Sequence, residues 1–432
     1  MERQSLATAM TGRGISRREF AKSAVAIGGV SALAACLDRS GGGTVPAGID
    51  DPANLPDRQH AWDDALATDD AGNPRMPNHH VLLLLDYTGD GAPTEAHRTQ
   101  VEAALRSLER AYEWSNEGLL FTLAYGPAYF ERFDSGPAGV DLPAPEALAP
   151  FEDPEPDTPD ALLHLASDDE RAVLEAEEAL KGTTDTANDH EMDGSFDGVF
   201  ETAARRTGFI GAGLPAENQD VDGIPDSEPV PEDAPLFMGF KSGFKGNQAS
   251  EDRVTIEEGP FAGGSTAHLS FIRLQLQQWY EQDSRDQRVS KMFCPAHAAE
   301  GKVEGVGENL GADSGIDECP EDVVESSRRE GVVGHAQKLA GAREENSPRI
   351  LRRDFDSTDG GEAGVHFLSL QQSIADFVET RRAMNGSDVS ENSAVGQRVN
   401  NGILQYMRVE RRGNYLLPPR SLRALPPADP SQ

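Results

Sequence analysis

Lysine, cysteine and aromatic residues are scarce in this chain of 432 residues: seven are lysine, three are cysteine and 6% are aromatic. Basic residues number 39 against 74 acidic ones, which gives a net charge of −35. Because such a surface repels phosphates, it excludes nucleic acids and anionic membrane surfaces as partners. Acidity of this degree is typical of proteins from very salty surroundings, so we predict a halophilic protein whose fold is lost at low ionic strength.

The first 36 residues contain an apolar run that is too short to span a bilayer. Ser16–Lys22 includes a twin arginine followed by phenylalanine, and small apolar residues fill positions 24–35. This pattern is typical of a Tat export signal. Leu33-Ala34-Ala35-Cys36 resembles a lipobox, so we predict a lipid on Cys36 and anchoring at the outer face of the cytoplasmic membrane. Residues 37–78 are predicted to be a tether and a surface-wrapping segment.

The other two cysteines, Cys294 and Cys319, are each followed by proline in a segment with few apolar residues. Outside the cell an even pair is more often a disulfide than a metal site. Closing this loop would contribute on the order of 3 to 4 kcal/mol. One neighbouring histidine, His297, does not complete a zinc set with two cysteines. We therefore predict a disulfide that staples an exposed insertion, with His297 at the surface.

Apolar periodicity predicts two rounds of similar elements in the α+β class. In the first round a strand, a helix, two strands, a helix with Ser167 at its start and an extended segment follow in order, which is the ferredoxin-like pattern. These elements are expected at 80–86, 93–116, 119–125, 161–166, 167–180 and 207–210. The second round is expected at 236–240, 265–272, 274–282, 365–370 and 374–384.

We therefore predict two ferredoxin-like domains with antiparallel sheets, packed as one unit. The first covers residues 79–231 and carries an acidic insertion. The second covers residues 232–412 and carries the disulfide-stapled insertion. Residues 413–432 are predicted to be a tail. Four histidines are assigned to strand or core positions: His80, His164, His268 and His366.

The acidic insertion contains the start of a calcium-loop pattern. Oxygen ligands stand at relative positions 1, 3, 5 and 9 and glycine at position 6. These residues are Asn218, Asp220, Asp222, Asp226 and Gly223. The usual bidentate glutamate is missing, because Pro229 stands at position 12. Two interpretations stay open, a calcium site and a solvated acidic loop, and the missing glutamate favours the loop.

Glycine-rich turns, an isolated histidine and a pair of arginines follow one another in the second half. The segments are Phe237-Met-Gly-Phe-Lys-Ser-Gly-Phe-Lys245, Gly263-Gly264-Ser265, Ile272-Arg273-Leu274, His335 and Leu351-Arg352-Arg353. In order and approximate spacing they resemble the dye-decolourising (Dyp-type) haem peroxidases. In the first half, Leu120–Phe130 and Asp160–Asp168 are similar to strands of that family. The resemblance covers residues 80 to 385.

The resemblance implies haem b in the second domain, with hydrogen peroxide and an unidentified electron donor as substrates. It implies that His335 is the axial ligand of the haem iron and that Arg353 lies on the opposite face, where its charge would stabilise peroxide during cleavage. Further haem-binding positions implied by the resemblance are Gly264, Ser265, Arg273 and Phe367.

One departure from the family is Ser242, which stands where the family has its distal aspartate. A hydroxyl cannot accept and return the peroxide proton as a carboxylate does, so we expect part of the 10²- to 10⁴-fold acid–base contribution to be lost. Three functions stay open: an anchored haem peroxidase, a haem-binding protein with little turnover that handles haem or iron, and a haem-free structural or interaction protein. A homo-oligomer is also left open.

Overall fold

The computed structural model describes residues 44–133, 135–227, 229–344, 347–391 and 394–432. The predicted export signal and lipobox lie outside these residues. No helix in the described ranges is long and apolar enough to cross a membrane. Residues 45–432 form one unit by their internal contacts, and the elements below all belong to it.

The first half of this unit has the predicted order of strands and helices. Its elements are β1 (His79–Tyr87), α3 (Glu95–Ala111), β2 (Leu120–Tyr125), β4 (Ala161–Ser167), α5 (Glu170–Leu180) and β7 (Phe200–Phe209). The strands pair antiparallel in the order β7-β1-β4-β2. The apolar run in β1 is continuous because alternate side chains pack on the helices and inside the sheet. The cap of α5 is Asp169 rather than Ser167, which ends β4.

The second half repeats this arrangement with more helices. Its elements are β8 (Ser265–Leu274), α7 (Leu276–Glu281), α8 (Arg285–Met292), α9 (Pro295–Ala299), α10 (Val323–Glu330), α11 (His335–Ala340), β9 (Leu351–Arg352), β10 (Phe355–Ser357), β11 (Gly364–Gln371), α12 (Ile374–Asn385) and β12 (Met407–Leu417). The antiparallel order is β12-β8-β11, and both β9 and β10 pair with the free edge of β11.

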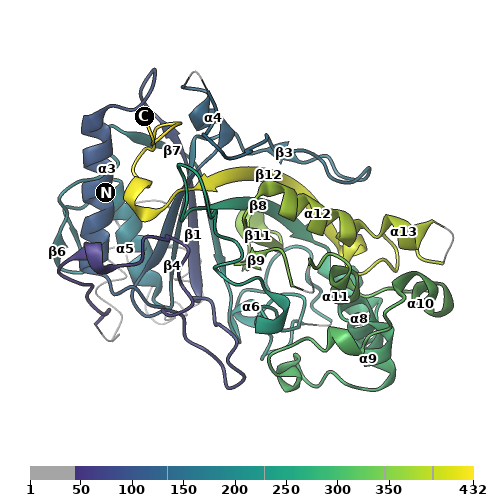
Figure 1. Ribbon diagram of the computed structural model, residues 1–432. Coiled ribbons are helices and arrows are strands. Elements are labelled where there is room, and N and C mark those ends of the chain that lie inside the picture. The colour runs from purple at the N-terminus through teal and green to yellow at the C-terminus, as the bar shows by residue number, and fades with distance from the viewer. Residues whose placement is uncertain (1–43, 134, 228, 345–346, 392–393) are drawn as a thin grey trace, which may run out of the picture. The chain divides into compact units, whose positions relative to one another are not determined.

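The two halves join edge to edge and close the sheet. Figure 1 shows β1, β4 and β7 of the first half beside β8, β11 and β12 of the second. Strand β2 meets β12 through Tyr125 and Leu416, and β10 meets β7 through Asp356 and Phe209. Eight strands therefore form a closed, barrel-like antiparallel sheet, with β9 and the short β3 (Glu155–Pro156) attached outside the ring. The predicted α+β class with an antiparallel sheet is confirmed, and the four histidines assigned to the core are all buried.

Three boundaries differ from those expected. Residues 236–240 form a turn, in which Gly239 has φ +79°, rather than a strand. The predicted tail at 413–432 is wrong, because β12 continues to Leu417 and both Arg420 and Arg423 are buried in ion pairs with Glu109. The N-terminal wrapping segment also enters the core, since Trp62 is fully buried.

Candidate functional site

A cavity of about 230 Å³ lies in the second half of the chain. Its walls come from strands β8, β11 and β12 and from helices α8, α11 and α12, which Figure 1 shows in the same part of the molecule. Most of the walls are apolar. Among the apolar side chains are Leu236, Met238, Phe240, Phe244, Ile272, Met292, Phe293, Leu339, Val365, Phe367, Phe377, Ile403 and Val409.

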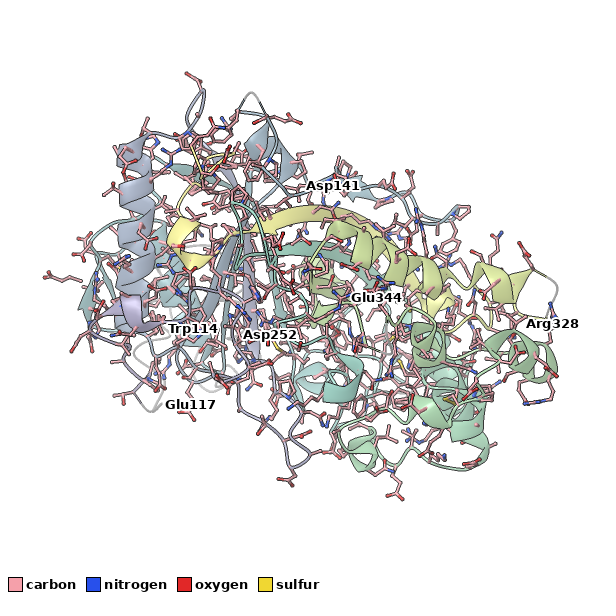
Figure 2. All side chains as sticks on the ribbon, viewed as in Figure 1. Trp114, Glu117, Asp141, Asp252, Arg328 and Glu344 are labelled. Atoms are coloured by element: carbon pink, nitrogen blue, oxygen red, sulfur yellow. A yellow bond between two sulfur atoms is a disulfide. The ribbon has the colours of Figure 1, made fainter. Side chains whose placement is uncertain are left out.

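The charged side chains at the cavity are mainly cationic, in contrast to the chain as a whole. Two acids border it, Asp354 and Asp356. The cations at its border are Lys241, Arg343, Arg349, Arg352, Arg381 and Arg412. Elsewhere acidic groups such as Glu117, Asp141 and Asp252 are exposed at the surface (Figure 2). The cavity is therefore suited to an apolar ligand that carries negative charge.

His335 borders this cavity at the first position of α11. Its pKa is lowered well below the usual value, first by burial and then by the positive charges of Lys338, Arg352 and Arg381. Its buried Nδ1 has no hydrogen-bond partner among the described residues. A neutral imidazole without a protein partner is the form of histidine that binds a metal ion. In many metal sites the nitrogen of the histidine that does not bind the metal donates a hydrogen bond to a protein acceptor. Among the described residues, Nδ1 of His335 has no such acceptor.

Arg353 does not lie at the cavity, so the predicted position of this residue is wrong. Its guanidinium donates to the backbone oxygen of His60 at 2.6 Å, lies 3.3 Å from Glu251 and stacks 4.0 Å above the ring of Trp62. Side chains alternate in extended chain, so the neighbouring Arg352 points the other way and borders the cavity. Its nearest acid is Asp354, 3.9 Å away, and its guanidinium makes no hydrogen bond to the described residues.

Of the other predicted haem-site residues, Ser242 and Phe367 border the cavity. Ser265 does not, because its hydroxyl is buried against the backbone oxygen of Val254 at 2.9 Å. Gly264 packs on the backbone of β12 instead. Neither of these two predicted haem-binding residues therefore lies at the cavity.

Arg273 also lies away from the cavity. It is paired with Glu410 at 3.2 Å and Glu362 at 3.4 Å. The alternation of β8 explains this, since Ile272 and Leu274 face the cavity and Arg273 faces outward.

Asp356 is a site residue that the sequence analysis missed. It is 2% exposed, and its Oδ2 accepts a hydrogen bond from the backbone N–H of Phe237. Burial raises the pKa of Asp356 well above the usual value; the Phe237 bond lowers it and the charge of Asp354 raises it further. The signal was present in the sequence, because residues 352, 354 and 356 share one face of an extended segment.

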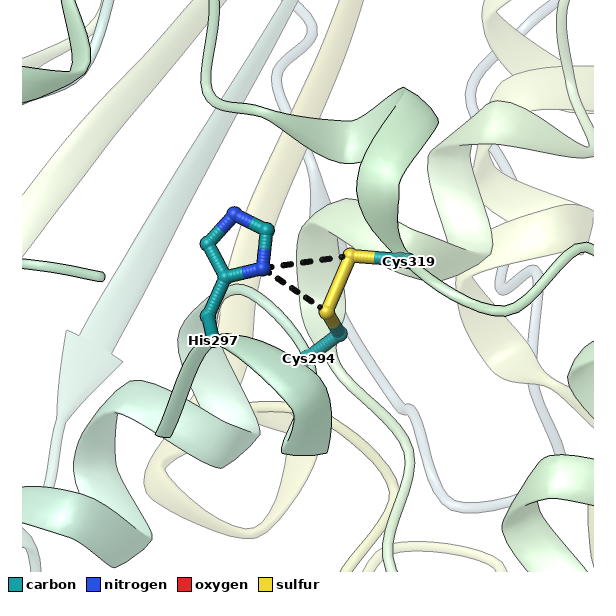
Figure 3. Close-up of side chains that lie close together, drawn as sticks. All are labelled: Cys294, His297 and Cys319. Carbon is teal, nitrogen blue, oxygen red and sulfur yellow. Dashed lines mark hydrogen bonds between the residues drawn. A yellow bond between two sulfur atoms is a disulfide. The ribbon is translucent and has the colours of Figure 1, made fainter. Parts of the chain in front are cut away.

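The predicted disulfide between Cys294 and Cys319 is present (Figure 3), and both cysteines are buried. His297 is fully buried, so its predicted surface position is wrong. Its Nδ1 lies 3.0 Å from the Cys294 sulfur, and its Nε2 lies 3.0 Å from the backbone oxygen of Ser314. Phe293, Ser314 and Ile316 border the cavity, so the bridge fixes part of the cavity wall.

The four residues of the calcium-loop pattern do not converge. Asp220, Asp222 and Asp226 are exposed, and Asn218 is half-buried. In the described ranges the sole group of three or more histidine, cysteine or acidic ligand atoms close together is Cys294, His297 and Cys319. The backbone of Asp222 is held by a β-bridge to Glu362. The structure thus agrees with the solvated-loop interpretation.

One known protein family matches the sequence of this chain. Residues 77–419 match the model of a family of unknown function, DUF7405. The chain belongs to this family. No curated protein matches the sequence of this DUF7405 chain.

Solved structures share the fold of the DUF7405 chain at low sequence identity. The dye-decolorizing protein from V. cholerae is 14% identical with a TM-score of 0.52, covering 82% of this chain and 97% of that one. The DyP-type peroxidase from Streptomyces coelicolor is 18% identical with a TM-score of 0.55, covering 80% and 90%. DyPB from Rhodococcus jostii RHA1 is 15% identical with a TM-score of 0.52, covering 82% and 96%. The fold is therefore that of the Dyp-type peroxidases.

Proposed function

We propose that this protein is a haem-dependent peroxidase of Dyp type that reduces hydrogen peroxide and oxidises a donor one electron at a time. The observation that carries the proposal is His335, a neutral imidazole without a hydrogen-bond partner in the described chain, at the border of an apolar, cation-lined cavity. Solved structures with this fold are named as peroxidases, and a DypB variant from Rhodococcus jostii RHA1 was solved in complex with heme.

The residues at the cavity fit haem b. Haem is a flat apolar ring with two carboxylates, and the cavity offers apolar walls together with six cations. In the proposed complex His335 would hold the iron, Phe367 would contribute to the apolar wall around the ring, and the cations at the cavity border would bind the carboxylates. When bound, the haem iron supplies the redox chemistry. Calcium has no place in the proposed complex, since the acidic loop does not gather its ligands.

Arg352 takes the electrostatic role first expected of Arg353. Its guanidinium is not engaged in a side-chain hydrogen bond within the described chain and has a single, distant acidic neighbour. A fixed positive charge with unused donors can bind the anionic form of peroxide and stabilise charge on the oxygen that leaves. Ser242 borders the same cavity and can hold a water molecule, but it offers no carboxylate.

The test is peroxide-dependent oxidation of a dye by the haem-loaded protein. We expect turnover in the wild-type protein and a loss on the order of 10²- to 10³-fold in Arg352→Leu, the effect typical of removing one preorganised donor. Arg328→Leu is the matched control, because Arg328 is exposed and lies outside the cavity (Figure 2). Haem-loaded wild-type protein that gives no turnover would contradict the proposal.

The second candidate is a haem-binding protein with little turnover. Two features favour it. The resemblance implies a carboxylate where this chain has Ser242, and Nδ1 of His335 has no acceptor among the described residues that would raise the basicity of the ligand. A stable haem complex without peroxide-dependent dye oxidation would select this function over the first.

Export and anchoring belong to the same proposal. The twin-arginine segment at Ser16–Lys22 and the lipobox ending at Cys36 support a lipid-anchored protein outside the cytoplasm. Cell fractionation tests this, with Cys36→Ser expected in the soluble fraction and wild-type protein in the membrane fraction. A Cys36→Ser protein that stays with the membrane would contradict the anchor.

A further inference from the structure

Three charged side chains in one extended segment share the cavity face. Arg352, Asp354 and Asp356 are two residues apart, and all three border the cavity. Between them, Arg353 and Phe355 are buried on the opposite side. The position of Asp356 is fixed by barrel closure, because its backbone pairs with Phe209 of β7 and with Val365 of β11. A carboxyl group is thus held rigidly at the wall of the proposed haem site.

The surroundings of Asp356 do not explain why an acid stands there. No salt bridge to Asp356 occurs among the described residues, and its one hydrogen bond comes from the Phe237 N–H to Oδ2. An asparagine could accept that same bond without the cost of burying an ionisable group. The carboxyl is therefore costly for the fold, and buried acids of this kind in a cavity are typical of functional sites.

We propose that Asp356 is the acid–base residue of the peroxidase reaction, in place of the carboxylate that Ser242 lacks. This rests on the proposed peroxidase function. A neutral carboxyl can give its proton to the peroxide oxygen that leaves, so that this oxygen departs as water rather than as hydroxide. The proton that hydrogen peroxide loses on binding passes to water, and the carboxyl regains a proton from water after the oxygen has left. Over one turnover hydrogen peroxide takes two protons and two electrons, the electrons coming from two donor molecules, and yields two waters.

The groups that face Asp356 allow this role. Asp354 of the same segment disfavours the ionised form of Asp356, and burial does so more strongly. Tyr280 of α7 is close enough for the charge of Asp356 to act on it, and its hydroxyl donates to the backbone oxygen of Phe237 at 2.7 Å. Arg352 borders the same cavity but its nearest acid is Asp354. Asp354 lies beside a cation and Asp356 does not. Such different environments favour the ionised form of Asp354 and the neutral form of Asp356, which can then act as an acid.

A first experiment needs no haem. The infrared spectrum of the apoprotein near neutral pH should contain the C=O stretch of a protonated carboxylic acid. That band should disappear in Asp356→Asn and stay in Asp90→Asn, a matched control at an exposed position outside the cavity. A wild-type spectrum without the band, or a band that persists in Asp356→Asn, would overturn the proposal.

The second experiment uses haem-loaded protein. Asp356→Asn should retain the Soret band and lose 10²- to 10⁴-fold in kcat/KM for hydrogen peroxide, the range of a general acid–base group. Ser242→Asp added to Asp356→Asn should restore part of this loss by returning a carboxyl to the cavity. Unchanged turnover in Asp356→Asn, or a larger loss in Asp354→Asn, would overturn the role of Asp356 while leaving the peroxidase function intact. Absence of turnover in wild type would overturn both.

Discussion

At the scale of single residues, the two neighbouring arginines should behave differently when either is replaced by leucine. Arg353 is 3% exposed, pairs with the half-buried Glu251 and stacks on Trp62, so Arg353→Leu should lower the free energy of unfolding by about 3 to 5 kcal/mol. Arg352→Leu should lower peroxide turnover with little effect on stability, because it forms no close ion pair. Chemical denaturation separates the two, and equal losses of stability would contradict the assignment.

Asp356 should also make stability depend on pH. Its pKa is raised in the folded protein, so its favourable contribution is fully present below the unfolded value of about 3.9 and is lost as the pH rises through the folded value. At neutral pH and above, Asp356→Asn should therefore melt at a higher temperature than wild type. At pH 3 the difference should vanish. Melting curves across pH check this, and a destabilised Asp356→Asn at pH 8 would contradict it.

Part of the site could be predicted from single residues and part could not. The order and spacing of sequence motifs predicted that His335, Ser242 and Phe367 belong to one site, and all three border the same cavity. Order and spacing did not decide between Arg352 and Arg353, since a shift of one residue in an extended segment reverses the face. Which of the two arginines packs on Trp62 depends on a contact between residues that are nearly 300 positions apart in the sequence.

At the scale of elements, the disulfide and the helices around it should control the shape of the cavity. The double variant Cys294→Ser, Cys319→Ser should lose about 3 to 4 kcal/mol of unfolding free energy. It should also release haem faster, because Phe293, Ser314 and Ile316 border the cavity on the bridged segment. Transfer of haem to an excess of apomyoglobin measures the release. A rate equal to that of wild type would contradict a role for the bridge in the cavity wall.

Elements with strong periodicity were predicted well. Strands β1, β4 and β11 and helices α3, α5 and α12 lie close to their expected ranges. Strand β12 was missed because its Arg408, Glu410, Arg411 and Arg412 do not read as a strand of a buried sheet. Arg411 and Arg412 form ion pairs with Asp157 and Glu152, which lie far away in the sequence. A local sequence pattern therefore cannot predict that these arginines belong to a strand.

At the scale of the whole molecule, the excess of acid should make the fold salt-dependent. With a net charge of −35, repulsion between acidic groups should lower the melting temperature as salt is removed. Melting curves in molar salt and in dilute buffer test this. The same melting temperature in both would contradict a halophilic protein.

The closed sheet also explains why the order of motifs was informative although sequence identity to solved structures is at most 18% in the comparisons above. Strands β10 and β11 of the ring and the attached β9 border one cavity together with α11, so residues spread over more than 100 positions meet there. The two halves of the sheet are joined by one residue pair between β10 and β7 and one between β12 and β2. Sequence periodicity does not predict such single pairs.

The most direct test of the account is the absorption spectrum of protein titrated with haemin. Wild-type protein should bind one equivalent and show a Soret band. His335→Ala should lose the band or shift it, while His190→Ala, a control at an exposed histidine, should match wild type. A Soret band that is unchanged in His335→Ala, or absent from wild type, would contradict haem ligation by His335.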